Sequence, residues 1–266
     1  MKKILFFLLI AVFSLGISAQ APSKKCPVCG LSIPKCQYKG KHPKKKPAPT
    51  AQIRQQPSKP AKPAKPVSKP RSTTGTLNGY DWVDLGLSVK WATKNVGASS
   101  PSDYGDYFAW GETQTKKRFD WDNCFDCLDS TGDSWGTYKI GGKTSISPTS
   151  GHDAARENWG GTWRMPTDAE FEELCDETKC DWTWTSQGGH EGYKVTGPNG
   201  NSIFLPAAGW RVGTDRCCVG EDGDYWSSTL SPFDSYDACN LNFDSSGHYT
   251  IDFHRSYGHS VRPVTE

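Results

Sequence analysis

The clearest structural signal in the chain is "WGGTWRMPTDAEFEEL", residues 159–174. Thr167 and Glu170 have the spacing of a capping box, in which each side chain satisfies the other residue's exposed backbone amide at the start of a helix. Phe171 and Leu174 follow at helical spacing, and both are apolar. The stretch therefore predicts a short helix that begins after Thr167 and buries Phe171 and Leu174.

A second short helix is expected just upstream, over residues 152–160. Asp153 near its start is a favoured N-cap residue, and Gly160 after its end is a favoured stop residue. Downstream of residue 180, the runs "DWTWTS", "GYKVTGP" and "SIFLPAAGW" are separated by Gly and Pro turns, which predicts three short strands.

Two further strands are expected earlier in the chain. Residues 79–97 are apolar near every second position, the period of a half-buried strand, and residues 103–112 form a shorter run of the same kind. Residues 113–150 have little periodicity and predict a long surface loop. Together the elements predict an α+β domain over residues 76–266, with two short helices packed on twisted antiparallel strands and long loops.

Charge divides the chain into two regions. Residues 21–75 contain 14 Lys and Arg residues and no Asp or Glu, whereas residues 76–266 contain all 29 acidic residues against 15 basic ones, a net charge of −14. The overall net charge of +2 conceals this division. The two regions attract each other, and each is expected to steer partners of opposite charge at low salt.

Residues 1–20 have the pattern of a secretory signal peptide. A basic start precedes an apolar run over residues 4–17, and Ser18 and Ala19 offer a cleavage site. The run is shorter than the roughly 20 residues that a membrane helix needs. We therefore expect a secreted chain, located in the periplasm, at the cell surface or outside the cell, with no transmembrane segment after cleavage.

Residues 21–48 contain a cysteine cluster that predicts a zinc knuckle. Cys26 and Cys29 form a Cys-x-x-Cys pair, and Cys36 and His42 complete a set of three thiolates and one imidazole that suits tetrahedral zinc. Metal binding would supply folding energy to a segment with almost no apolar core. A Cys26–Cys29 disulfide and reduced thiols in a disordered tail are the alternatives.

Residues 49–75 are rich in Lys and Pro and include "SKPAKPAKPVSKP". Proline keeps the backbone extended and the lysines repel one another, so the segment is expected to be a semi-rigid spacer. Its charge would also allow association with the cell envelope. Nucleic acid is not favoured as a partner, because aromatic residues for base stacking are absent from this segment.

Ten cysteines in a chain that is expected to be secreted predict disulfides. Neighbours in sequence, such as Cys124 with Cys127 and Cys175 with Cys180, could pair, although spacing does not define connectivity. At least one cysteine is unpaired within the domain, because an odd number lies there: Cys124, Cys127, Cys175, Cys180, Cys217, Cys218 and Cys239.

Six stretches in register resemble one known group of domains. They are the stretch over 159–174, "VDLGLSVKWATKNVGA" (83–98), "DYGDYFAWGET" (103–113), "GYKVTGPNGNSIFLPAAGWR" (192–211), "YWSST" (225–229) and "GHSVRPV" (258–264). In them the chain resembles the Fibrobacter succinogenes major paralogous domain family, within the C-type lectin-like, formylglycine-generating-enzyme-like fold. The resemblance implies that fold and a secreted surface protein. The group includes variable proteins of diversity-generating retroelements.

The resemblance also bears on catalysis. The related oxidases use a cysteine at the end of the last strand, whereas Pro263 stands there in this chain and no cysteine follows Cys239. The chain also lacks a His-Glu-x-x-His helix, a Gly-x-Ser-x-Gly elbow and a phosphate loop. We therefore expect no enzymatic activity. A structural envelope protein, and a degenerate redox enzyme that uses Cys217, Cys218 or Cys239, are the alternatives.

Several Asp-rich stretches could supply oxygen ligands to a structural calcium ion. Solvated turns are the alternative, because Asp and Gly favour turns by themselves. The Glu-Pro-Asn and Trp-Asn-Asp signatures of calcium-dependent lectins are absent, so calcium-mediated sugar binding is not expected. The candidate stretches are Asp222-Gly-Asp224, Asp103-x-x-Asp106 and Asp120-x-Asp122-Asn123.

The C-terminal region is predicted to form a recognition face, anchored by the buried residues Tyr225, Trp226, Leu241 and Phe243. Tyr, Ser, Asp and His are the mix that binding loops use, and in retroelement-diversified relatives this region varies at Asn codons, one base away from all four. The predicted function is a secreted or cell-surface, non-enzymatic module with a protein or glycan ligand. Ordinary polar-outward alternation on an antiparallel sheet is the alternative. The predicted ligand-binding residues are Phe233, Asp234, Tyr236, Asp237, Asp244, Ser246, His248, Tyr249, Asp252, His254, Tyr257 and His259.

Overall fold

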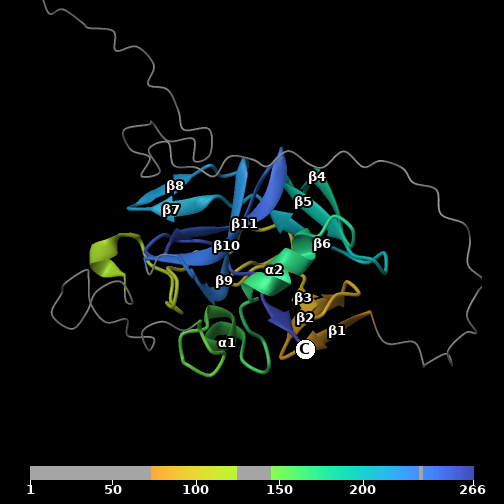
Figure 1. Ribbon diagram of the computed structural model, residues 1–266, viewed down its shortest axis with the longest axis horizontal. Helices are drawn as coiled ribbons and strands as arrows, with labels where there is room; N and C mark the ends of the chain where they lie inside the picture. The colour runs from red at the N-terminus through yellow and green to blue at the C-terminus, as the bar shows by residue number, and fades with distance from the viewer. Residues whose placement is uncertain (1–72, 125–144, 234–235) are drawn as a thin grey trace, which may run out of the picture. The chain divides into compact units, whose positions relative to one another are not determined.

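The computed structural model describes residues 73–124, 145–233 and 236–266 (Figure 1). The expected signal peptide, the zinc ligands and the spacer up to residue 72 lie outside the described residues, as do Cys127 and Asp234. What was expected of them remains a prediction. The first strand begins at Thr74, two residues before the expected domain boundary.

The described residues form four antiparallel sheets. The first has the order β1 (Thr74–Leu77), β2 (Tyr80–Asp84), β3 (Lys90–Ala92), β12 (Val264–Thr265), so the last strand lies beside an early one. The second consists of β4 (Asp181–Gln187), β5 (His190–Thr196) and β6 (Ser202–Pro206). In the third, β10 (Asp237–Asp244) lies between β9 (Asp222–Leu230) and β11 (Gly247–His254). The fourth is the hairpin of β7 (Trp210–Val212) and β8 (Asp215–Cys217).

The helix predicted from the capping box is confirmed. α2 (Asp168–Cys175) begins after Thr167, whose hydroxyl accepts a hydrogen bond from the Glu170 amide, while the Glu170 carboxylate accepts one from the Thr167 amide. Phe171 and Leu174 are completely buried, as their spacing predicted.

The upstream helix is confirmed as well, over a shorter range than expected. α1 (Ala154–Trp159) begins after Asp153, whose side chain accepts a hydrogen bond from the Arg156 amide. It ends at Gly160, which has a φ of +66° that favours glycine. With few short helices and antiparallel strands in several sheets, the described residues agree with an α+β fold class in outline.

The strand expected over residues 79–97 is in fact two strands. β2 and β3 pair with each other in antiparallel register, so the chain reverses direction between them. Gly86 lies in the connection with a φ of +80°, a conformation that the apolar alternation on either side of it does not reveal.

The strand expected over residues 103–112 is wrong. Phe108 makes only an isolated bridge to His259. The amides on either side bond elsewhere: Asp106 N donates to Val96 O and Trp110 N donates to Arg255 O. No continuous ladder forms, because one short segment contacts several different partners.

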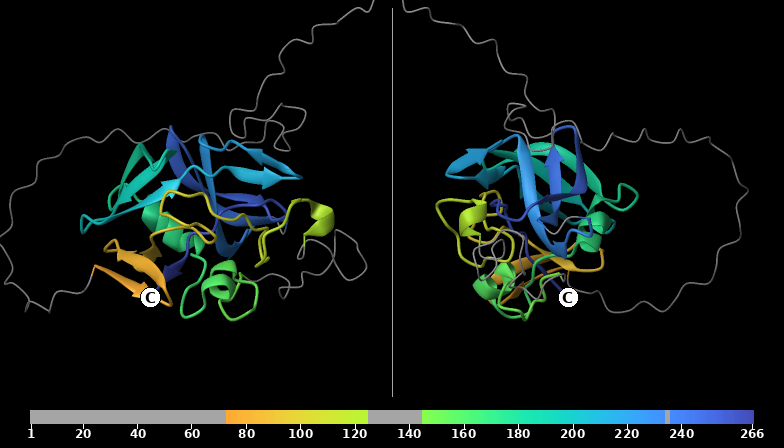
Figure 2. Two further views of the ribbon diagram at one scale, coloured as in Figure 1. Left: turned by 180° about the vertical axis from the view of Figure 1, so that it is seen from behind. Right: turned by 60° about the vertical axis from the view of Figure 1, so that its left-hand side comes forward.

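α2 packs against the β9–β10–β11 sheet (Figure 2), and the main apolar cluster joins both to residues of β2, β3, β5, β6 and β12. The predicted anchors Tyr225, Leu241 and Phe243 are completely buried and belong to the same apolar cluster as Phe171 of α2. Trp226, the fourth predicted anchor, is equally buried, but strand alternation places its ring on the opposite face of the sheet.

Candidate ligand-binding surface

The β10–β11 hairpin carries many of the predicted ligand-binding residues, and its register divides them between two faces. Side chains alternate along a strand, so Asp244 and Tyr249 lie on the face away from α2. The face toward α2 carries Asp237, His248, Asp252 and His254. The structure therefore does not assemble the predicted residues into one recognition face.

Two of the predicted histidines pack inward. The His259 ring is completely buried and stacks on Trp226 with 3.9 Å between ring centroids, so its expected role in surface binding is wrong. His248 is half-buried and stacks on Trp182 at 4.1 Å with an interplanar angle of 6°. Burial lowers the pKa of both rings below the ordinary value of 6.5, which favours neutral imidazoles in these stacks.

Two of the predicted carboxylates hold the sheet together. Asp252 Oδ1 accepts a hydrogen bond from the Cys239 thiol at 3.3 Å, and its Oδ2 accepts one from the Ser231 hydroxyl at 2.9 Å. Asp244 Oδ1 accepts hydrogen bonds from both the amide and the hydroxyl of Ser246, at 2.6 and 2.5 Å, and so closes the β10–β11 turn.

Four half-buried aromatic residues lie in contact with one another, and we call them the aromatic ridge: Trp121, Tyr236, His254 and Tyr257. The Trp121 ring lies 5.1 Å from Tyr236 and 4.8 Å from His254, measured between centroids. His254 in turn lies 5.5 Å from Tyr257. Trp121 belongs to the short 3-10 helix η1 (Trp121–Asn123), whereas the other three residues come from the C-terminal region.

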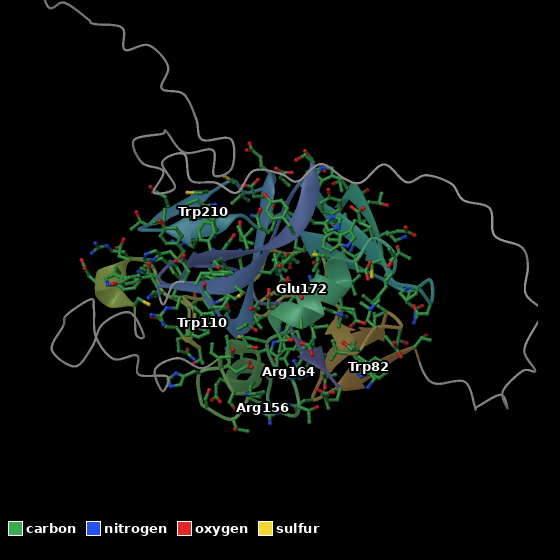
Figure 3. All side chains as sticks on the ribbon, in the orientation of Figure 1. Trp82, Trp110, Arg156, Arg164, Glu172 and Trp210 are labelled. Atoms are coloured by element: carbon green, nitrogen blue, oxygen red, sulfur yellow. The ribbon has the colours of Figure 1, made fainter. Side chains whose placement is uncertain are left out.

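The ridge is supported from the core. Tyr257 stacks on the buried Trp210 of β7, with 5.1 Å between ring centroids. Figure 3 shows Trp210 well away from Glu172 on α2. Phe253 contacts both Tyr257, at 5.3 Å, and His259, at 4.9 Å. A continuous series of ring contacts therefore runs from the half-buried Tyr257 to the completely buried Trp226. Rings that are packed in this way lose little conformational entropy when they bind a partner.

Phe233 extends the same end of the hairpin. Its side chain is 90% exposed, although large apolar side chains are normally covered. It lies three residues after the end of β9 and three before Tyr236, and its amide donates to the Ser231 hydroxyl. Tyr249 is 40% exposed but lies at the opposite end of the hairpin.

Trp121 and Trp210 were missed by sequence reasoning. Trp121 lies in the polar stretch that predicts a surface loop, and Trp210 ends a run that predicts a short strand. A tryptophan between two Asp residues in a loop was the available signal, because such a ring needs a packing partner or a ligand.

A hollow lies away from the aromatic ridge. It has a volume of about 180 Å³ and is lined by residues of β5 and β6, together with Thr93, Pro101 and Gln187. Small-molecule sites usually enclose about 300–1,000 Å³. None of the predicted ligand-binding residues lines this hollow.

The thiols are poorly suited to redox catalysis. Five described cysteines are free, including Cys175 and Cys180, which do not pair with each other. Burial raises the pKa of Cys175 to about 12 and that of Cys180 to about 11, and it also raises the pKa of Cys217, Cys218 and Cys239. A reactive cysteine needs a depressed pKa so that the thiolate is present.

Within residues 73–124, 145–233 and 236–266, no three His, Cys, Asp or Glu side chains are arranged to hold a metal ion. Asp103 of one calcium candidate instead accepts hydrogen bonds from the amides of Ser99 and Ser100. Calcium and the N-terminal zinc remain predictions.

Comparisons with protein-family models, with curated proteins and with solved structures find no match for this chain. No helix in the described part of the chain has the length and apolar character needed to cross a membrane.

Proposed function

We propose that this protein is a secreted or cell-surface binding module without enzymatic activity, and that the aromatic ridge together with Phe233 contacts its partner. The secreted location follows from the signal pattern of residues 1–20. The C-type lectin-like fold is part of the proposal, and it is supported by the six stretches that resemble that group and by the two helices and antiparallel strands.

The single observation that carries the proposal is a packed cluster of half-buried rings whose member Tyr236 follows the exposed Phe233 by three residues. Aromatic side chains contribute most to binding hot spots, because they bury a large area at a small entropic cost. Rings that project from the surface are typical of macromolecular interfaces, so a protein or glycan partner fits the ridge.

The test measures binding of the fluorescently labelled full-length chain to whole cells by flow cytometry. Trp121→Ala and Tyr257→Ala should each weaken binding by about tenfold or more, because truncation at a hot spot costs at least about 1.4 kcal/mol. Protease treatment of the cells should abolish binding to a protein partner, and periodate treatment should abolish binding to a glycan.

Tyr104→Ala provides the matched control. Tyr104 is also a half-buried aromatic residue, but it packs on His190 away from the ridge. Equal binding by all three variants, with unchanged near-ultraviolet circular dichroism, would exclude the ridge as the binding surface.

A further inference from the structure

A second cluster of polar side chains lies at the other end of the β9–β10–β11 sheet, on the face away from α2. Asp222 pairs with Asp244, and Asp224 pairs with Asn242, which in turn pairs with Tyr249 on β11. We call these five residues the acidic cluster. It lies at the Asp244–Gly247 end of the hairpin, whereas the aromatic ridge lies at the Asp237–His254 end.

Asp224 is the unusual member of the acidic cluster. It is completely buried, and its Oδ1 accepts hydrogen bonds from the side-chain amides of Asn240, at 3.1 Å, and Asn242, at 2.9 Å. Its Oδ2 has no hydrogen-bond partner among the described residues, and neither has Asn240 Oδ1. A buried acceptor of this kind normally has a partner, so its environment calls for a donor or a positive charge.

No cation of the described residues compensates these carboxylates. Ion pairs form at Glu112, Asp120, Glu170, Glu173 and Glu266, and none of these pairs involves the acidic cluster. Burial is the main reason that the pKa of Asp222 rises to about 6 and that of Asp224 to about 7. Repulsion from Asp244 and Glu221 adds to the rise at Asp222, and repulsion from Asp222 adds to the rise at Asp224.

Tyr249 makes the acidic cluster accessible. Its side chain is 40% exposed, and the pKa of its phenol is raised first by burial and then by Asp244, Asp224 and Asp222. The ring therefore stands within the electrostatic field of all three carboxylates. An aromatic face beside carboxylates attracts cations through both its quadrupole and their charge.

The arrangement favours an organic cation over a metal ion. Asp222 and Asp224 lie on one face of β9, about 6.8 Å apart along the strand, and Asp244 stands opposite Asp222. No three His, Cys, Asp or Glu side chains among the described residues are arranged to hold a metal. A guanidinium or ammonium group with several N–H donors can bridge carboxylates that are spread in this way.

We propose that the acidic cluster binds a lysine or arginine side chain from a basic segment of a partner protein. Asp222 and Asp244 at the half-buried rim would accept its hydrogen bonds, Tyr249 would cover its alkyl stem, and the buried Asp224 would add charge from beneath. The net charge of −14 on residues 76–266 would attract such a segment in competition with the 14 basic residues of residues 21–75. The site is independent of the aromatic ridge, so either proposal can fail without the other.

The probe is a lysine tetrapeptide with blocked ends, and its counterpart carries acetyl groups on every lysine. Binding to the full-length chain is measured by calorimetry at about pH 8, where Asp224 is ionised, and at about 20 and about 150 mM salt. The lysine peptide should bind, and acetylation should abolish binding. Asp244→Asn should weaken it about fivefold, which corresponds to about 1 kcal/mol.

Asp215→Asn is the matched control, because Asp215 is an exposed carboxylate on β8 outside the acidic cluster and its loss changes the net charge equally. Asn at position 244 keeps an oxygen for the Ser246 bonds, so the hairpin turn is retained. Tyr249→Leu provides a second variant, with the same expected loss, should Asp244→Asn not fold. Tyr236→Ala, in the ridge, should bind the peptide normally.

Three outcomes would overturn the proposal. The peptide could fail to bind at either salt concentration, or Asp215→Asn could weaken binding as much as Asp244→Asn, which would indicate non-specific attraction. Calcium could also bind with the same dependence on Asp244, which would assign the acidic cluster to a metal.

Discussion

Arg262 and Asn95 are both completely buried, and Arg262 Nε donates a hydrogen bond to Asn95 Oδ1 over 2.8 Å. The remaining guanidinium nitrogens donate to the carbonyl oxygens of Ala92, at 3.1 Å, and Phe204, at 2.9 Å. Arg262 thus joins the C-terminal segment to β3 and β6. Burial lowers its pKa to about 10, so the guanidinium stays charged at neutral pH.

Replacing Arg262 should therefore destabilise the fold strongly. Arg262→Met leaves three buried acceptors without their donors, and we expect the free energy of unfolding to fall by about 3–5 kcal/mol. Urea denaturation followed by tryptophan fluorescence measures the change. Lys117→Met, at an exposed position, should stay within about 0.5 kcal/mol, and an equal effect of the two substitutions would contradict the structural role of Arg262.

Asp224 should make stability depend on pH near neutrality. Burial raises its pKa in the folded protein from 3.8 to about 7, so the folded state holds the proton more tightly than the unfolded state. Its contribution to the free energy of unfolding is therefore fully present below about pH 4 and is lost as the pH rises through about 7. The loss amounts to at most about 4 kcal/mol, at about 1.4 kcal/mol per unit.

The Asp224→Asn variant isolates that contribution. An amide at this position cannot ionise, and its oxygen can still accept from Asn240 and Asn242. As the pH rises from about 5 to about 8, the free energy of unfolding of the variant should increase relative to that of the original chain, because only the original chain carries a carboxyl that ionises there. A difference that stays constant over this range would mean that Asp224 does not titrate there.

Gly223 permits the close approach of β9 to the core. A Cβ atom added there would lie 2.0 Å from Cζ of the buried Phe243, within the apolar cluster beneath α2. Gly223→Ala should lower the free energy of unfolding by about 1–3 kcal/mol through overpacking. Gly247→Ala is the control, because a Cβ there meets nothing within 4 Å, and it should leave the urea midpoint nearly unchanged.

The free thiols should react slowly in the folded protein. Burial raises the pKa of all five, so little thiolate is present at about pH 8. Iodoacetamide labelling resolved by peptide mass spectrometry should be slow for Cys239 in buffer and fast in urea. Rapid labelling of folded Cys217, Cys218 or Cys239 would instead revive the redox alternative.

Local sequence predicted the elements whose signals are local. The capping box of Thr167 and Glu170 and the stripe of Phe171 and Leu174 produce α2 as expected, because helix caps satisfy amides within the same turn. The alternating runs after residue 180 form β4, β5 and β6. Tyr225, Leu241 and Phe243 could be recognised as core residues from their apolar character alone.

Partners that lie far apart in the chain could not be read from the sequence. Trp121 of η1 and Tyr236, just before β10, are brought together from parts of the chain that lie far apart, so no spacing rule connects them. The segment around Phe108 has the composition of a strand, yet its amides bond to Val96, His259 and Arg255 in turn. His259 has the polarity of a surface residue, and only its stack on Trp226 shows that it is buried.

By itself, the sequence determined the separation of charge, the two helices and most strands of this protein, because these depend on residues that are neighbours along the chain. The tertiary structure alone decided which rings form the aromatic ridge and which carboxylates form the acidic cluster. Both depend on strand register, and a shift of one residue would move every side chain of β10 to the opposite face.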